Sequence, residues 1–253
     1  MKLKEVFIHS LFILSIILVY SCSSTKDASP KTADDVFTKA IERFKKEDWE
    51  QATQLFDVIK LQYPASQYAD DASFYLAEIN YKKKEYILAS FNYSMLRKVY
   101  PTSEYFKTAV YKTAMSFYEL SPSFDRDQEY TYKAIDALQD FQRLYPDDSL
   151  FKQVSVYIDK LREKLGLRAF NTAEIYQKME NFKSAVIYYD AVIEEFPDTK
   201  FLEPAYYQKI VCLATMKKSD DALSIIDLYR KKYSNGSFMK EILQLEKTMN
   251  SPK

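Results

Sequence analysis

The chain has 253 residues with 36 basic and 36 acidic side chains, enough for one large domain or two small ones with a sizeable core. Only 2 glycines accompany 22 tyrosines and 17 phenylalanines, which disfavours folds that depend on glycine-rich turns or phosphate-binding loops. The single histidine, His9, lies in a segment that we expect to be removed. Imidazole catalysis and histidine-ligated metal are therefore excluded, and we expect no cofactor and no enzymatic activity. The equal numbers of basic and acidic residues also disfavour nucleic acid as a partner.

Residues 1–21 resemble the signal peptide of a bacterial lipoprotein. Two lysines precede an apolar run over residues 6–20, which is shorter than the ~20 residues that a spanning helix needs. The run ends just before Cys22, as in a lipobox, where the cysteine becomes the acylated N-terminus after cleavage. We predict lipidation of Cys22 and a flexible tether over residues 22–32, so that the chain is held at a membrane. An uncleaved signal anchor is the alternative.

A repeat of about 37 residues follows the tether. An aromatic-proline pair recurs along the chain, with a degenerate last copy: Tyr63-Pro64, Tyr100-Pro101, Tyr145-Pro146, Phe196-Pro197 and Tyr233-Ser234. Twelve residues before the second member of each pair stands an alanine: Ala52, Ala89, Ala134, Ala185 and Ala222. The third copy carries an insertion of eight residues around 121–128, and the fourth carries about four additional helical turns before Ala173.

Each copy contains two helical patterns separated by a short turn, and the second pattern stops just before the proline. One such pair cannot bury its own apolar face, so the pairs must stack. The spacing of alanine, aromatic residue and proline resembles the tetratricopeptide repeat. We predict an all-α, tetratricopeptide-repeat solenoid of about five helix pairs in a right-handed superhelix. The domain spans residues 33–250, with repeats at about 33–66, 70–103, 107–148, 166–199 and 203–236 and a C-terminal capping helix.

Two series of aromatic residues mark a candidate groove. In repeats of this kind the first helix of each pair lines the concave face, and here it carries aromatics seven positions apart on one face. The candidates for binding an extended apolar peptide are Phe37, Phe44, Phe74, Tyr81, Tyr111 and Tyr118. The alternative is that these rings fill the space between helix pairs. The second series ends after the third copy, where Gln177 and Ala214 take its place, which favours the groove for that series.

Three further features complete the candidate sites. Asp125, Arg126 and Asp127 alternate in charge within the insertion, and they either bridge to neighbouring helices or bind a partner. Phe170 and Tyr207 continue the first aromatic series into the last two repeats, where we expect partner binding. Cys212 is expected to be a small buried apolar side chain.

Several stretches resemble the BamD family of outer-membrane protein assembly factors. They are Asp48-Trp49-Glu50-Gln51-Ala52, Ser123-Phe124-Asp125-Arg126-Asp127, Tyr145-Pro146-Asp147-Asp148-Ser149, Ala173-Glu174-Ile175-Tyr176 and Phe196-Pro197-Asp198-Thr199. The resemblance implies a lipid-anchored scaffold on the periplasmic face of the outer membrane. It implies that the C-terminal repeats bind the POTRA domains of a BamA-like barrel, alongside other assembly-machinery subunits. It also implies that the N-terminal repeats receive segments of unfolded outer-membrane proteins.

Two other classes of function compete with this interpretation. One is a tetratricopeptide lipoprotein that acts as an adaptor in cell-envelope or division complexes. The other is a surface lipoprotein that binds glycans, although sugar platforms favour exposed tryptophan and the chain has only Trp49. Paired carboxylates such as Glu194-Glu195 are adjacent on a helix and point apart, which is the wrong geometry for acid-base chemistry on one bond.

Overall fold

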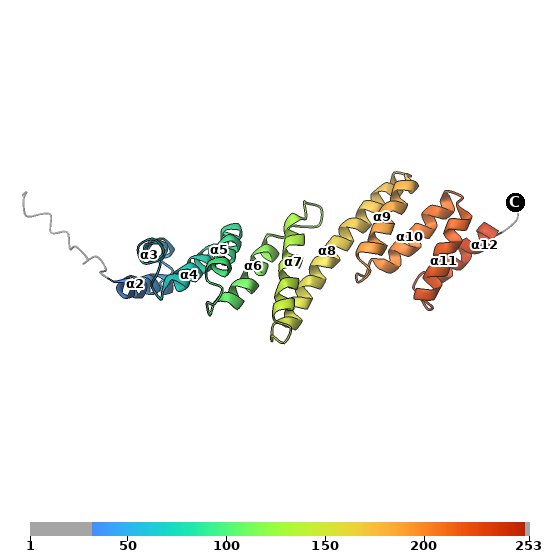
Figure 1. The fold of residues 1–253 in the computed structure, drawn as a ribbon. Helices are drawn as coiled ribbons and strands as arrows, with labels where there is room; N and C mark the ends of the chain where they lie inside the picture. Colours follow the sequence, from blue (N-terminus) through green and yellow to red (C-terminus); the bar gives the residue numbers. More distant parts are fainter. Residues whose placement is uncertain (1–31, 251–253) are drawn as a thin grey trace, which may run out of the picture. The chain divides into compact units, whose positions relative to one another are not determined.

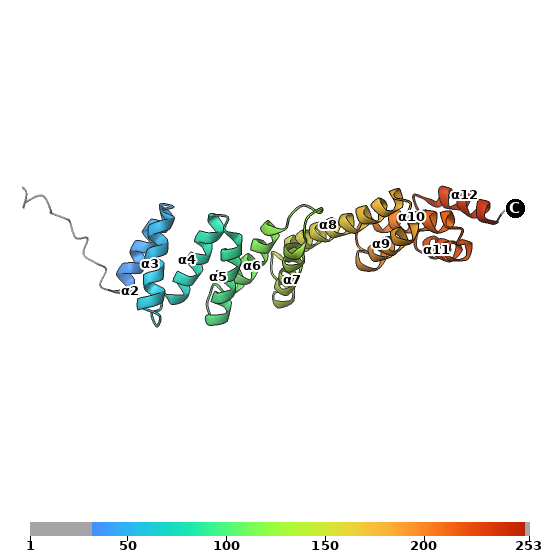
Figure 2. The ribbon, with the colours of Figure 1, turned by 90° about the horizontal axis from the view of Figure 1, so that it is seen from above.

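The computed structural model describes residues 32–250, which form eleven helices and no strand (Figures 1 and 2). The predicted signal peptide, Cys22 and nearly all of the tether lie outside the described residues. The helices are α2 (Ala33–Lys45), α3 (Trp49–Gln62), α4 (Ala69–Lys82), α5 (Tyr86–Val99), α6 (Phe106–Leu120), α7 (Glu129–Leu144), α8 (Phe151–Lys178), α9 (Phe182–Glu195), α10 (Leu202–Thr215), α11 (Ser219–Lys232) and α12 (Met239–Asn250). No helix in this part of the chain is long and apolar enough to cross a membrane.

The helices are packed as consecutive pairs in two compact units. The first unit ends at Tyr68 and holds the pair α2–α3. The second begins at Ala69 and holds the pairs α4–α5, α6–α7, α8–α9 and α10–α11, each in contact with the next, and α12 against the last pair. This is the all-α tetratricopeptide-repeat solenoid that the sequence predicts.

Four of the five pairs are closed by the same short turn. After the first helix of the pair, one residue adopts a left-handed backbone with φ near 60°: Glu47, Lys84, Glu180 and Lys217. In the second pair the N–H of Lys84 donates to the carbonyl of Tyr81 (3.0 Å), and the N–H of Glu85 donates to that of Asn80 (2.8 Å). This backbone pairing is the Schellman motif, which satisfies carbonyls at a helix C-terminus. The same two backbone hydrogen bonds recur in all four turns.

The repeated alanines lie where the helices approach one another. Ala40, Ala77, Ala114 and Ala173 on the first helices are fully buried. So are the alanines twelve residues before each aromatic-proline pair, from Ala52 to Ala222. Large side chains fill the space beside them. The residue four positions after each of these second alanines has no exposed surface: Phe56, Tyr93, Leu138, Tyr189 and Ile226. Close helix packing at small residues with large residues between them produces the dense interior of each pair.

The third and fourth copies depart from the regular pattern as the proline spacing indicates. Residues 121–128 form a loop between α6 and α7 in place of the short turn. The helix α8 has 28 residues, twice the length of α3, α4 or α5, and it absorbs the additional residues of the fourth copy in one continuous helix (Figure 1).

Candidate binding surfaces

The rings of the first aromatic series pack against residues that precede a later helix. In four copies the ring contacts a second aromatic ring that stands 31 residues later in the chain: Phe37 with Tyr68, Phe74 with Tyr105, Phe170 with Phe201 and Tyr207 with Phe238. The pair Phe74–Tyr105 is stacked, with ring centroids 4.1 Å apart and an interplanar angle of 12°. In the third copy the eight-residue insertion moves the corresponding position to Leu150, which packs in the same core cluster as Tyr111.

This arrangement corresponds to the packing alternative for the first series. Tyr111 places its edge against Phe141 at 5.5 Å, and Phe170 does the same with Tyr189 at 5.6 Å. Each ring of the series is only partly exposed. A peptide-binding role for these rings stays a prediction. The interval of 31 residues is visible in the sequence and would have indicated stacking between repeats.

Two of the three rings of the second series pack within their own hairpin. Phe44 places its edge against Trp49 at 5.4 Å, and Tyr81 places its edge against Tyr86 at 5.3 Å. In both cases the partner is the first residue of the second helix of the pair. Tyr118 instead contacts Tyr157 of α8 at 4.8 Å. Phe44 and Tyr81 therefore pack beside the turns of their hairpins, and all three rings keep part of their surface exposed.

Tyr81 lies in a polar environment that suits a structural role. The ammonium group of Lys112 lies 4.1 Å from the centroid of its ring, and Lys112 also pairs with Glu78 at 3.4 Å. Burial, followed by the charge of Glu119, raises the pKa of Tyr81 to about 12. The phenol is therefore neutral at any physiological pH and offers a hydrogen-bond donor beside a fixed cation.

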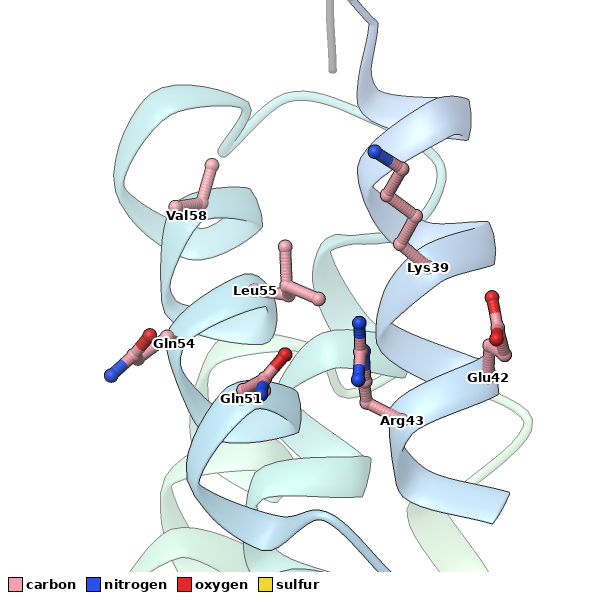
Figure 3. A pocket seen from close by; sticks show the side chains of 7 residues that line it. All are labelled: Lys39, Glu42, Arg43, Gln51, Gln54, Leu55 and Val58. Atoms are coloured by element: carbon pink, nitrogen blue, oxygen red, sulfur yellow. The ribbon is translucent and has the colours of Figure 1, made fainter. Parts of the chain in front are cut away.

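A cleft between α2 and α3 in the first unit was not found from the sequence. It has a volume of about 480 Å³, and its lining residues are Lys39, Glu42, Arg43, Gln51, Gln54, Leu55 and Val58. Lys39 and Arg43 point from α2 toward α3, whereas Glu42 points away from the cleft (Figure 3). The guanidinium of Arg43 lies 3.4 Å from the carboxylate of Asp48.

The chemistry of this cleft suits a carboxylate attached to an apolar group. Two cations stand one helical turn apart on α2, and Leu55 and Val58 supply apolar surface from α3. The signal in the sequence was the pair Lys39 and Arg43 at positions i and i+4, which place both charges on one helix face. Proteins bind the C-terminus of an extended peptide with positive charge for its carboxylate and apolar surface for its last side chain.

The insertion loop is anchored to α8 through its main-chain carbonyls and not through its three charged side chains. The guanidinium of Arg168, on α8, donates to the carbonyls of Phe124 (3.0 Å) and Arg126. Inside the loop, the buried amide of Gln128 donates to the carbonyls of Ser123 (2.8 Å) and Arg126 (2.9 Å). The hydroxyl of Thr131 in turn donates to the Gln128 carbonyl oxygen at 2.7 Å.

Asp125, Arg126 and Asp127 are thereby exposed on a supported loop. Asp125 accepts a hydrogen bond from the hydroxyl of Ser123 at 2.5 Å, which holds the pKa of its carboxyl below the usual value. Asp127 accepts from the N–H of Glu129 at the start of α7 at 2.9 Å. The bridging to α8 is therefore made by main-chain carbonyls, and partner binding by the charged side chains stays a prediction.

The middle of α8 supports two turns at once. Lys164 donates to the hydroxyl of Ser121 at 2.8 Å at the start of the insertion loop. Arg162 forms a bidentate ion pair with Asp198, in which Nη2 lies 2.6 Å from Oδ1 and Nε contacts Oδ2. The same Nη2 donates to the carbonyl of Glu195 at 2.8 Å. Gly166 follows these two residues on α8, and a Cβ at this position would approach Thr199 Oγ1 to 2.9 Å. A larger residue at position 166 would therefore displace the side chain of Thr199.

The buried thiol of Cys212 behaves as a packing residue. It is fully buried in the cluster between α9 and α10, and burial raises the pKa of this thiol to about 11. A thiol that is protonated and inaccessible at neutral pH is a poor nucleophile.

Within residues 32–250, five consecutive helix pairs that pack through buried alanines, four of them closed by a common turn, define the chain as a tetratricopeptide-repeat protein. The sequence profile of the YfiO family, described as "Outer membrane lipoprotein", matches residues 29–234. The chain belongs to this family of outer membrane lipoproteins.

Relatives with assigned functions are distant in sequence. The chain is 22% identical over 249 residues to the outer membrane protein assembly factor BamD of Rickettsia prowazekii, covering 98% of both proteins. It is 21% identical over 187 residues to BamD of Caulobacter vibrioides, covering 74% of this chain and 61% of that protein.

Solved structures of tetratricopeptide-repeat proteins also align with the chain. The TPR2AB domain of yeast Sti1 aligns over 87% of this chain and 98% of its own, with 15% identity and a TM-score of 0.39. A tetratricopeptide repeat protein from Parabacteroides merdae aligns over 87% and 99%, with 14% identity and a TM-score of 0.39. Both scores are low, so the fold assignment rests on the helix pairs themselves.

Proposed function

We propose that the protein is a non-catalytic scaffold of the machinery that inserts β-barrel proteins into the outer membrane. The observation that carries this proposal is the family match over residues 29–234, together with similarity to two BamD proteins, one of them along almost the full length of both chains. A repeat protein of stacked hairpins offers surfaces for partners. In this function the predicted acyl group on Cys22 holds the protein on the periplasmic face of the membrane.

The C-terminal repeats bind the POTRA domains of a BamA-like barrel in this proposal. Supporting it, the hairpin α8–α9 exposes three large apolar side chains: Ile175 is 56% exposed, Met179 69% and Ile187 61%. Beside them Tyr176 and Tyr188 stack with ring centroids 5.0 Å apart. Apolar and aromatic side chains at an accessible surface are the usual centre of a protein interface.

Copurification of a BamA-like barrel tests this assignment. Tagged protein is recovered from detergent-solubilised envelopes, and its partners are quantified by mass spectrometry. We expect a barrel with POTRA domains in near-equal amount, and a several-fold loss with Ile187→Glu. The matched control is Gln54→Glu, because Gln54 takes the equivalent position in α3 and is already exposed and polar. Unchanged recovery with Ile187→Glu would exclude this surface, and absence of any barrel from the wild type would contradict the proposed function.

A second test addresses the charges of the insertion loop. Asp125→Lys with Arg126→Glu reverses two exposed side chains while the hydrogen bonds from Arg168 to the loop carbonyls remain. If this loop contacts a subunit of the machinery, copurification of that subunit falls while thermal unfolding is unchanged. Phe170 and Tyr207 are poorer targets, because both rings pack between hairpins and their loss would change stability as well.

The N-terminal cleft receives the end of an unfolded outer-membrane protein. Such proteins commonly end in an aromatic residue, and the cleft offers Lys39 and Arg43 beside Leu55 and Val58. The test is the affinity of the full chain for a peptide with a C-terminal phenylalanine, compared with the same peptide amidated. We expect the amide, and the variant Arg43→Gln, to bind several-fold more weakly.

Variants of the second aromatic series distinguish peptide binding in the cleft from peptide binding in the groove that the sequence predicts. Phe44→Leu and Tyr81→Leu keep apolar volume at each ring position, so the hairpins remain closed. If either variant weakens binding as much as Arg43→Gln does, the aromatic rings contact the peptide. If neither variant weakens binding and the amidated peptide still binds more weakly than the acid, the cleft alone binds the peptide. Equal affinity for acid and amide peptides would remove the cleft from the proposal.

A further inference from the structure

The outward face of α5 carries a stripe of exposed apolar side chains along its whole length. Its members are between 38% and 59% exposed: Ile87, Leu88, Phe91, Met95 and Val99. The opposite face of the same helix is the buried one, where Ala89, Tyr93 and Leu96 pack against α4 and α6. The helix is therefore apolar on both faces although only one is covered. Apolar surface of this extent on a monomer usually marks an interaction site.

The other repeats provide an internal comparison for this stripe. At the equivalent positions α3 carries Glu50, Gln51, Gln54, Val58 and Gln62, and α11 carries Asp220, Asp221, Ser224, Leu228 and Lys232. These positions need no apolar residue to build a hairpin, because α3 and α11 form theirs with one apolar residue among the five. The stripe on α5 is thus not explained by the fold.

Basic residues surround the stripe at both ends. The segment 82–100 contains five of them and a single acidic residue, Glu85: Lys82, Lys83, Lys84, Arg97 and Lys98. Glu85 is paired with Lys83 at 2.7 Å. None of the five stripe positions is acidic or adjacent to an aspartate, and the exposed lysines Lys84 and Lys98 stand at opposite ends of the helix. The surface is apolar in the middle with positive charge at the ends.

We propose that α5 lies on an anionic phospholipid surface, with its apolar stripe inserted at the boundary between headgroups and acyl chains. Helices that bind a membrane in this way carry apolar side chains on one face and lysines that reach the phosphates. A helix of 14 residues is ~21 Å long and lies in the interface rather than spanning it. A protein of an outer membrane lipoprotein family has such a surface within reach. The contact does not depend on which proteins the repeats bind.

The test is a fluorescent probe of lipid depth on the full-length protein. The protein is purified from membranes and reconstituted into vesicles of phosphatidylethanolamine and phosphatidylglycerol. A polarity-sensitive dye is attached to a cysteine introduced as Phe91→Cys on the stripe. Gln54→Cys in α3 and Ser224→Cys in α11 are the matched controls at the equivalent position of their hairpins. The native Cys212 is buried and reacts poorly, and the predicted lipidation of Cys22 leaves that residue without a free thiol, so labelling is selective.

We expect a blue shift and a several-fold rise in emission at position 91, with quenching by lipids brominated in their acyl chains. Positions 54 and 224 should show neither. On vesicles of phosphatidylcholine alone the change at position 91 should be smaller, because the basic residues then lack anionic headgroups. Equal emission at all three positions would overturn the proposal. A blue shift at position 91 that brominated lipids do not quench would also overturn it, since the stripe would then be covered by protein.

A second variant keeps the proposal falsifiable if the label itself disturbs the surface. Leu88→Gln, Phe91→Gln and Met95→Gln together make the middle of the stripe polar, and the three side chains are exposed, so the hairpin should still fold. With the dye moved to Val99→Cys, this triple variant should lose the blue shift that the same label shows in the otherwise unchanged protein. Retention of the full shift in the triple variant, with an unchanged unfolding temperature, would contradict the proposal.

Discussion

The regular hairpins and the third hairpin differ in what holds the connection between their two helices. In α2–α3, α4–α5, α8–α9 and α10–α11 a turn of a few residues closes the pair through two backbone hydrogen bonds around one left-handed residue. In α6–α7 the loop 121–128 depends on side chains, two of which, Lys164 and Arg168, come from α8 about 40 residues later. The regular turns are therefore locally encoded, whereas the loop forms only when α8 is in place.

We expect the largest loss of stability from a substitution inside the insertion loop. Gln128→Ala removes the buried amide that serves the carbonyls of Ser123 and Arg126. Buried polar groups left without partners should lower the free energy of unfolding by about 2–3 kcal/mol. Urea unfolding measures this loss, and hydrogen exchange should show faster exchange in residues 121–128 than in the regular turns. A loss below about 0.5 kcal/mol would mean that solvent replaces the amide and that the loop is not held by it.

The next effect tests the support that α8 gives to a distant turn. Gly166→Ala would gain about 1 kcal/mol of helix propensity in an isolated helix. Here the new methyl group meets the side chain of Thr199, so we expect a net loss of about 1–2 kcal/mol in stability.

Thr199→Ala in the same chain is the control for that substitution. It removes the two closest atoms, Oγ1 and Cγ2, and should recover part of the loss in a double-mutant cycle. If Gly166→Ala raises the stability by itself, the turn moves aside and the contact is not restrictive.

A smaller effect of opposite sign tests the local turns. Lys84→Gly places glycine where φ is 61°, a backbone that other residues adopt at a cost. We expect a gain of about 0.5–1 kcal/mol in the free energy of unfolding. The matched control is Asp125→Gly in the insertion loop, which has no left-handed residue among those described and should lose stability instead. Equal effects from both substitutions would erase the distinction between the two kinds of turn.

The smallest effect is a pH dependence at the second turn that α8 supports. Hydrogen bonding from Arg162 holds the pKa of the Asp198 carboxyl below its usual range. The ionised form is thus favoured by folding, so its contribution is present above the unfolded pKa of about 3.9 and is lost as the pH falls through the lower folded pKa. Because the pair is largely exposed, the contribution should be below about 1 kcal/mol.

Urea unfolding at several pH values compares the wild type with Asp198→Asn and Arg162→Gln. Asp198→Asn should lose a small part of the stability at pH 7 and converge with the wild type at the most acidic pH. Arg162→Gln should lose slightly more, and part of its loss should persist in acid, because it also removes the hydrogen bond to the Glu195 carbonyl. A difference that grows as the pH falls would contradict the assigned sign.

The comparison also explains how far the sequence could be interpreted. Alanine and aromatic-proline spacing predicted five helix pairs, the insertion and the long α8, because each depends on residues within one repeat. The stacking of Phe74 on Tyr105 was not predicted, although the interval of 31 residues recurs in the sequence, because a spacing alone does not show that two rings meet. The anchoring of the loop by Arg168 joins residues 44 positions apart, and no local pattern contains it. The α2–α3 cleft was missed for the same reason, since its two walls come from different helices.

The candidate site residues were chosen by residue type and spacing, which cannot separate a ring that binds from a ring that packs. Phe37 and Phe74 satisfy the groove pattern, yet Phe37 is stacked on Tyr68 and Phe74 on Tyr105. Conversely, Leu88 and Phe91 look like part of a core stripe in the sequence, and the structure leaves them exposed on α5. Solvent exposure depends on which face the neighbouring repeat covers, and that is a tertiary property.

Depletion of the protein from growing cells tests its role in β-barrel assembly most directly. The amount of folded barrel proteins in isolated outer membranes is followed by their resistance to unfolding in cold detergent. If the protein is a scaffold of barrel insertion, folded barrels fall several-fold before other envelope proteins change, and a copy of the wild-type gene restores them. Unchanged levels of folded barrels after complete depletion would contradict the account.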